Sequence, residues 1–284
     1  MPKVAIVTDS TAYIPDELIK KYNISVVPLI LLWGHEAFED GVDIQPSEFY
    51  DRLAHAKVMP TTSQATIPAM QSTFERLVEK GCDVLGVFIS SKLSGTVQSA
   101  MQGRQMMTAG AEKVTIVDSN STAMAMGWQV LAAARAAEAG EGLAECQKIT
   151  EKARDHTGVY FVVDTLEFLH RGGRIGGAQA FLATALNIKP VLALQDGRVE
   201  AIDKVRTKSK ALDRLMDLVN ENTAGKTPLR LATLHVNAEA EARALLERAA
   251  AKMNPVETIF TCVSPVIGTH AGPGTVGLAY MAGM

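Results

Sequence analysis

The sequence has few cysteines and no pattern that would pair them or bind a metal through them. Cys82, Cys146 and Cys262 are its three cysteines, they lie far apart in 284 residues, and no Cys-x-x-Cys pair occurs. This spacing indicates neither a disulfide framework nor a thiolate zinc site. Because His-Glu-x-x-His and the phosphate-binding Gly-x-x-x-x-Gly-Lys-Ser/Thr pattern are also absent, we expect no metal and no cofactor.

Long apolar runs and an excess of one charge are absent as well. The apolar stretch VVPLILLW is too short to cross a bilayer, and the first residues, MPKVAIVTDS, enter a predicted strand without a signal-peptide pattern. The formal net charge of -3 gives no electrostatic reason to expect binding to nucleic acid or to an anionic membrane. We therefore expect a cytoplasmic protein without stable membrane insertion.

The pattern that is present predicts an α/β protein with two domains. Over residues 1–157, short apolar strands alternate with helical patterns, which is typical of a parallel sheet covered by helices; residues 24–33 and 83–90 are two such strands. Over residues 158–284, Asp196-Gly197 joins two strand-like runs and is a strong hairpin signal. We expect an N-terminal α/β domain, a C-terminal α+β domain with a largely antiparallel sheet, and a cleft between them.

The stretch ISSKLSGTVQSA places Ser94, Gly95 and Thr96 between a predicted strand and a predicted helix. Free backbone N–H groups, short hydroxyl side chains and the positive end of a helix dipole suit an anion at such a turn. Ser10 and Ser119 end two other predicted strands, so we expect them at the same edge of the sheet. Capping and turn formation are the more common roles of such residues, and both interpretations remain open.

Two further segments carry polar residues just outside regular elements. Thr62, in MPTTSQATIPAMQ, precedes a predicted helix, where capping is the alternative role. His270, in SPVIGTHAGPGTVGLAY, is expected in a glycine-rich loop whose backbone can approach a ligand closely. Three segments of this kind indicate one common ligand.

Two basic residues and one possible nucleophile each allow more than one role. Arg174 and Arg206 belong to a group of basic residues that is ordinarily a solvated surface, although arginine can also clamp phosphate through paired N–H donors. Ser94 lacks the Gly-x-Ser-x-Gly context of a hydrolase nucleophile. A hydrolase or esterase that uses Ser94 and His270 nevertheless remains an alternative.

The sequence resembles the DegV family, the fatty-acid-binding proteins of bacteria, along essentially its whole length. The strings IVTDSTA, PTTSQ, ISSKLSGTVQSA, TLEFLHRGGRIG and GTHAGPGTVGLAY carry the resemblance and follow the family order. The resemblance implies a two-domain α/β protein that buries a long-chain acyl group and holds its carboxylate near the domain junction.

Matched position by position, the resemblance implies that Thr62, Ser94 and His270 hold the carboxylate. Some members of the family present the fatty acid to a fatty acid kinase, a separate ATP-binding protein that converts it to an acyl phosphate, and the resemblance implies Arg174 and Arg206 as docking residues. We therefore expect a lipid-binding partner of a kinase that is not itself an enzyme. The alternatives are the Ser–His hydrolase and a lipid-sensing regulatory module.

Overall fold

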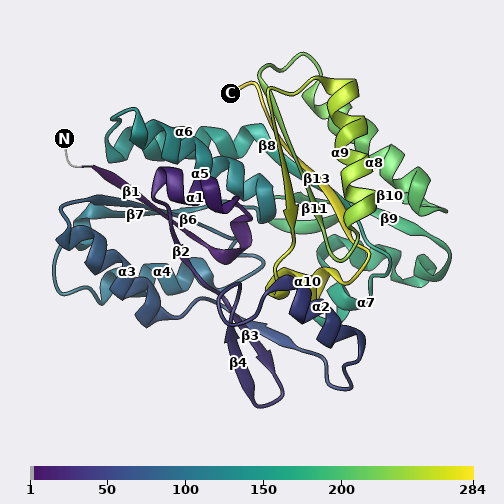
Figure 1. Ribbon diagram of the computed structural model, residues 1–284, viewed down its shortest axis with the longest axis horizontal. Coiled ribbons are helices and arrows are strands. Elements are labelled where there is room, and N and C mark those ends of the chain that lie inside the picture. Colours follow the sequence, from purple (N-terminus) through teal and green to yellow (C-terminus); the bar gives the residue numbers. More distant parts are fainter. Residues whose placement is uncertain (1–2) are drawn as a thin grey trace.

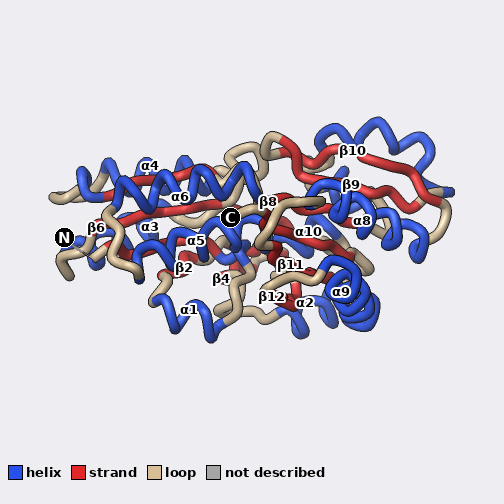
Figure 2. Tube along the Cα trace, turned by 90° about the horizontal axis from the view of Figure 1, so that it is seen from above, coloured by secondary structure: helices blue, strands red, loops and turns tan. Residues whose placement is uncertain are grey.

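The structure is a computed structural model that describes residues 3–284, with the side chains of residues 184–187 left aside. The described chain forms an elongated molecule with one large sheet toward each end (Figures 1 and 2). The fold class is confirmed: the chain is an α/β protein whose first sheet is parallel and whose second sheet is mostly antiparallel.

The first sheet has the strand order β2-β1-β6-β7, and every neighbouring pair is parallel. Its central strands are buried on both faces, as the continuous apolar runs predict. The strands are β1 (Val4–Asp9), β2 (Ser25–Val27), β6 (Asp83–Phe88) and β7 (Val114–Asp118). The associated helices are α1 (Asp16–Tyr22), α3 (Ile67–Glu79), α4 (Thr96–Gln105), α5 (Ala123–Glu138) and α6 (Leu143–His156).

The second sheet has the order β10-β9-β8-β13-β11-β12, and β11 with β12 is its one parallel pair within the described residues. Helices α8 (Lys208–Thr223) and α9 (Glu239–Met253) pack on it, while the buried helix α5 contacts strands of both large sheets. The strands are β8 (Thr157–Val162), β9 (Lys189–Gln195), β10 (Arg198–Val205), β11 (Leu229–His235), β12 (Glu257–Cys262) and β13 (Val276–Ala282). The sheet begins at Thr157, and the domain boundary at residues 157/158 stays a prediction.

A third, small sheet departs from the sequence prediction. Residues 24–33 were expected as one strand, but β2 ends before Pro28 and β3 (Ile30–Trp33) joins a different sheet, because proline lacks the N–H that would continue the ladder. β3 pairs antiparallel with β4 (Glu36–Glu39) and with β5 (Thr61–Ser63). The β3–β4 hairpin projects from the body of the molecule (Figure 1).

Short helices complete the described chain. His270 lies in the helix α10 (Pro265–Ala271), so its expected position in a loop was wrong. Pro265 starts this helix favourably and Gly272 follows its end. The other short elements are η1 (Ser10–Ala12), α2 (Pro46–Ala54), η2 (Ala111–Lys113), α7 (Glu167–Arg171) and η3 (Gly176–Asn187).

Candidate ligand-binding site

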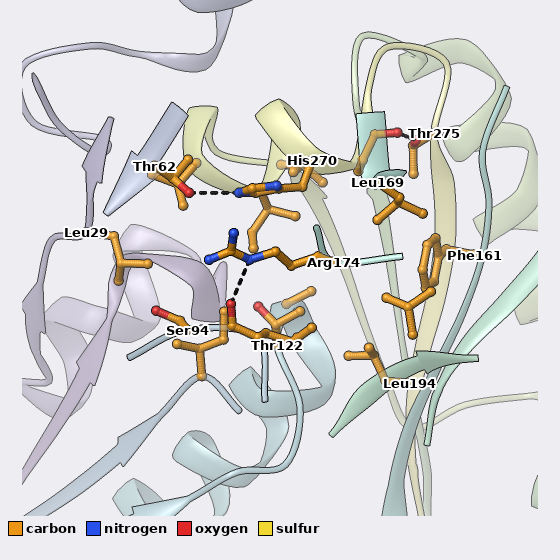
Figure 3. A pocket seen from close by; sticks show the side chains of 18 of the residues that line it. Leu29, Thr62, Ser94, Thr122, Phe161, Leu169, Arg174, Leu194, His270 and Thr275 are labelled. Atoms are coloured by element: carbon orange, nitrogen blue, oxygen red, sulfur yellow. Dashed lines mark hydrogen bonds between the residues drawn. The ribbon is translucent and has the colours of Figure 1, made fainter. Parts of the chain in front are cut away.

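A pocket lies between the two large sheets and takes its wall from both halves of the chain. Most of the side chains that line it are apolar, and the second sheet supplies many of them (Figure 3). They include Val159, Phe161, Leu194, Val199 and Leu234. An apolar pocket of this kind stabilises a hydrocarbon group by removing it from water.

Polar groups gather on the wall where the two halves meet. Thr62, Ser94, Gly95, Arg174 and His270 all line the pocket, although they come from distant segments of the chain. The hydroxyl Oγ1 of Thr62 lies 2.7 Å from Nε2 of His270, and this hydrogen bond joins β5 to α10 (Figure 3). The structure thus brings together the three residues predicted to hold a carboxylate, while that role itself stays a prediction.

His270 is a neutral imidazole at neutral pH. Only 9% of the residue is exposed, and burial together with the nearby positive charge of Arg174 lowers its pKa to about 4. Its Nδ1 is buried without a hydrogen-bond partner among the described residues. The ring therefore contributes hydrogen bonds to the site and no positive charge.

Ser94 follows β6 on the turn that leads into α4. Its Oγ lies 2.9 Å from Oγ1 of Thr96, which is fully buried and does not line the pocket. A β-carbon on Gly95 would lie 2.3 Å from Oε1 of Gln64, so glycine lets the turn pack against the segment that follows β5. Within the described structure Ser94 makes no hydrogen bond to His270, so the pair required for a Ser–His nucleophile is not formed.

Arg174 reaches into the pocket from the glycine-rich link after α7. Its Nε donates to the carbonyl of Leu93 at 3.0 Å and one terminal nitrogen donates to the carbonyl of Gly172 at 2.7 Å. Figure 3 shows its side chain between His270 and Ser94. The family resemblance implied Arg174 as a docking residue for a partner, and this role stays a prediction. The structure places its positively charged side chain in the polar part of the pocket wall. The glycines around it were the only local signal of this close approach.

The other candidate residues do not line this pocket. Ser119 exchanges hydrogen bonds with the backbone of Ser121 and borders a separate, more polar pocket. Arg206 is exposed on the segment between β10 and α8. Ser10 donates to a carboxylate oxygen of Asp40 at 2.7 Å, so its hydroxyl is engaged away from the pocket.

Asp40 links the end of β4 to the helix that carries His270, a role that no local pattern in the sequence predicts. It is 2% exposed and accepts a hydrogen bond from the backbone N–H of Val266 at 3.1 Å. Burial raises the pKa of its carboxyl to about 6. Tyr13 adds a contact of 3.1 Å to Ser264. Groups from the first half of the chain thus fix the start of α10.

The described residues hold no arrangement of three or more His, Cys, Asp or Glu side chains suited to a metal ion. Among the helices described, none has the length and apolarity needed to span a bilayer. The site therefore has the features of a binding site for an amphipathic anion: an apolar pocket with hydroxyl groups, a neutral imidazole and an arginine on one part of its wall.

Comparison with known proteins gives the family. A family model described as "Uncharacterised protein, DegV family" matches residues 3–283, and the chain belongs to this family. It is 33% identical over 280 residues to Protein DegV of Bacillus subtilis, with 98% of each chain covered. A DegV domain-containing protein of Streptomyces coelicolor is 39% identical over 277 residues, with 97% of each chain covered.

Two solved structures share the whole fold. A DegV family protein from Thermus thermophilus, whose structure is described as showing fatty acid binding, has a TM-score of 0.93 and 36% identity, and the match covers 99% of this chain and 100% of that one. DegV of Bacillus subtilis, described as a fatty acid binding protein, has a TM-score of 0.90 and 32% identity with the same coverage.

Proposed function

We propose that the protein binds a long-chain fatty acid in this pocket, with its carboxylate held by Thr62, Ser94 and His270. The observation that carries the proposal is the uneven polarity of the wall, where hydroxyl, imidazole and guanidinium groups gather on one part and aliphatic and aromatic side chains form the rest. The fatty acid binding described for relatives of the same fold supports it.

The tail supplies most of the affinity in this proposal. Each buried methylene contributes about 0.8 kcal/mol, so about fourteen of them contribute roughly 11 kcal/mol before the cost of ordering the ligand. The polar groups orient the head and select an acid over an alcohol, because a carboxylate accepts hydrogen bonds from hydroxyl and imidazole donors and pairs with Arg174. The protein acts in this proposal as a carrier, without chemistry of its own.

Native mass spectrometry tests the proposal directly. The purified protein is expected to carry an added mass that matches a saturated or mono-unsaturated fatty acid. After delipidation it should bind hexadecanoic acid and bind hexadecanol far more weakly. A protein that purifies without such a ligand and also refuses added fatty acid contradicts the proposal. An activated ester substrate, tried on the same preparation, tests for hydrolysis by Ser94.

We further propose that the bound fatty acid is presented to a separate fatty acid kinase. Arg206 is exposed and does not line the pocket, so it is accessible to another protein, whereas Arg174 lines the pocket together with the residues proposed to hold the carboxylate. Arg206→Ala should keep fatty-acid binding and reduce acyl-phosphate formation when the cognate kinase is supplied. Lys210→Ala, which removes another exposed positive charge nearby, is the matched control. Equal turnover by all three proteins removes the docking role of Arg206.

A further inference from the structure

The start of α5 is a buried helix end without a cap. Thr122 precedes the first turn and makes no side-chain capping bond. Among the residues that the structure describes, none accepts a hydrogen bond from the backbone N–H of Ala123, Met124 or Ala125, and all three residues are buried. The free N–H groups of a helix start are normally satisfied by a cap, by water or by a ligand. This end of α5 therefore lacks its partner.

Thr122 adds a hydroxyl group that also lacks a partner. It is 9% exposed, and its buried Oγ1 makes no hydrogen bond within the described structure. Thr122 and Ala123 both line the pocket, and Figure 3 shows Thr122 on the wall below Arg174. A buried hydroxyl without a hydrogen-bond partner lowers the stability of the fold. Because Thr122 lines the pocket, a ligand bound there can supply this partner.

The backbone at this point is also strained. Ala123 has a φ of 54°, in the left-handed region that residues with a β-carbon rarely adopt. Such conformations persist where the surrounding structure enforces them, and they are concentrated at ligand sites. Here the unusual turn places the first residue of α5 on the pocket wall.

Backbone hydrogen bonds connect the segment that precedes α5 to the turn that carries Ser94. The N–H of Ser90 donates to the carbonyl of Ser121 at 2.8 Å, and the N–H of Ser94 donates to the carbonyl of Ser90 at 3.0 Å. α5 follows β7 at the carboxyl edge of the parallel sheet, which is where ligands of open α/β sheets bind. The positive end of its dipole favours a negative charge there.

We propose that the start of α5 is a further part of the head-group site, in which the Thr122 hydroxyl and the free backbone N–H of Ala123, the two residues of this start that line the pocket, donate hydrogen bonds to an anionic oxygen of the ligand. This inference rests on the proposed function and deepens it. A carboxylate and a phosphoryl group offer the same oxygen chemistry, and the experiment separates the two.

The test compares two substitutions at one position. Thr122→Val keeps the shape of the side chain and removes the hydroxyl, whereas Thr122→Ser keeps the hydroxyl and is the control. Delipidated proteins are titrated with hexadecanoic acid, with hexadecyl phosphate and with hexadecanol. Thr122→Val should bind at least one of the two anions about tenfold more weakly, since a hydrogen bond to a charged group is lost. Thr122→Ser should stay close to the parent, and hexadecanol binding should not change.

The pattern of losses identifies the anion. A loss for hexadecanoic acid identifies the carboxylate, and a loss for hexadecyl phosphate alone identifies a phosphoryl group. Unchanged or tighter binding of both anions by Thr122→Val overturns the inference, as does an equal loss for hexadecanol, which would show a packing effect. Circular dichroism checks the fold, with Thr122→Ala as a second variant without the hydroxyl. A parent protein that binds neither anion removes the proposed function and this subsite with it.

Discussion

Thr62 Oγ1 lies 2.7 Å from His270 Nε2, although 208 positions separate the two residues in the sequence. Thr62 comes from the small sheet of the first half and His270 from α10 in the second half. The polar part of the pocket is therefore complete only when the two halves are packed together. A ligand head bound there stabilises that packing, because it binds the folded arrangement and not the open chain.

Replacement of Thr62 by valine should weaken fatty-acid binding. Thr62→Val keeps the β-branched shape but removes the hydroxyl that contacts His270. The loss should be about 1–3 kcal/mol, or roughly tenfold or more in Kd by fluorescent-ligand displacement. Thr61→Val is the matched control, because Thr61 is the exposed neighbour on the same strand and does not line the pocket. Equal affinities of the two variants and the parent would return Thr62 to a purely structural role.

Alanine at Gly172 should disturb the site through His270. A β-carbon on Gly172 would lie 2.0 Å from Nδ1 of the His270 ring, so the ring must move away from its bond with Thr62. We expect Gly172→Ala to weaken binding by about as much as Thr62→Val, since both lose the same hydrogen bond. In a His270→Ala background the added methyl group should cost much less, because only its 3.1 Å approach to the carbonyl oxygen of Phe168 remains. If Gly172→Ala lowers the affinity for fatty acid equally in the parent and in His270→Ala, the substitution does not act through the His270 ring.

The sequence predicted the elements that are determined by residues close together in the chain. The continuous apolar run of β1 and the turn at Asp196-Gly197 are confirmed, and both turn residues have the positive φ that a tight hairpin requires. β5 was missed because three residues with mostly exposed side chains carry no periodic signal. α10 was missed because its start is fixed by contacts with Asp40, 226 positions away from Val266.

The candidate site also contains residues that the sequence placed correctly and residues that it did not. Motif strings pointed to Thr62, Ser94 and His270, which the structure places on one pocket wall. Ser10 and Ser119 directly follow β1 and β7 at the expected edge of the sheet, but their hydroxyl groups bond to Asp40 and to the backbone of Ser121 instead. Side-chain direction depends on the packed neighbours of a residue, and no local pattern contains that information.

His270 should make stability depend on pH. Its pKa is about 4 in the folded protein, whereas the pKa of an exposed histidine is 6.5, so between these values the unfolded chain binds the proton and the folded protein does not. The contribution to the free energy of unfolding is present above pH 6.5 and is lost as the pH falls toward 4. Delipidated parent protein should lose about 2 kcal/mol more than His270→Gln between pH 7.5 and pH 5 in urea titrations. Parallel curves for the two proteins would contradict the assignment.

Asp40 should change the pH dependence of stability in the direction opposite to that of His270. Its pKa is raised from 3.8 to about 6, so between these values the folded protein holds a proton that the unfolded chain has released. Its contribution to stability is present below pH 3.8 and is lost as the pH rises through 6. In the parent the effects of Asp40 and His270 oppose each other between about pH 4 and pH 6. Asp40→Asn removes one of them, and the stability of that variant should fall more steeply on acidification than the stability of the parent.

At pH 7.5 Asp40→Asn should be no less stable than the parent, because a neutral side chain avoids the cost of a buried charge, which offsets the weaker hydrogen bonds to Val266 and Ser10. Asp43→Asn is the matched control, since Asp43 is exposed in the same loop and its loss changes the net charge equally. Urea titrations at pH 7.5 and pH 4.5 measure both variants beside the parent. If Asp40→Asn follows the pH dependence of Asp43→Asn, the carboxyl of Asp40 does not hold its proton in the folded protein.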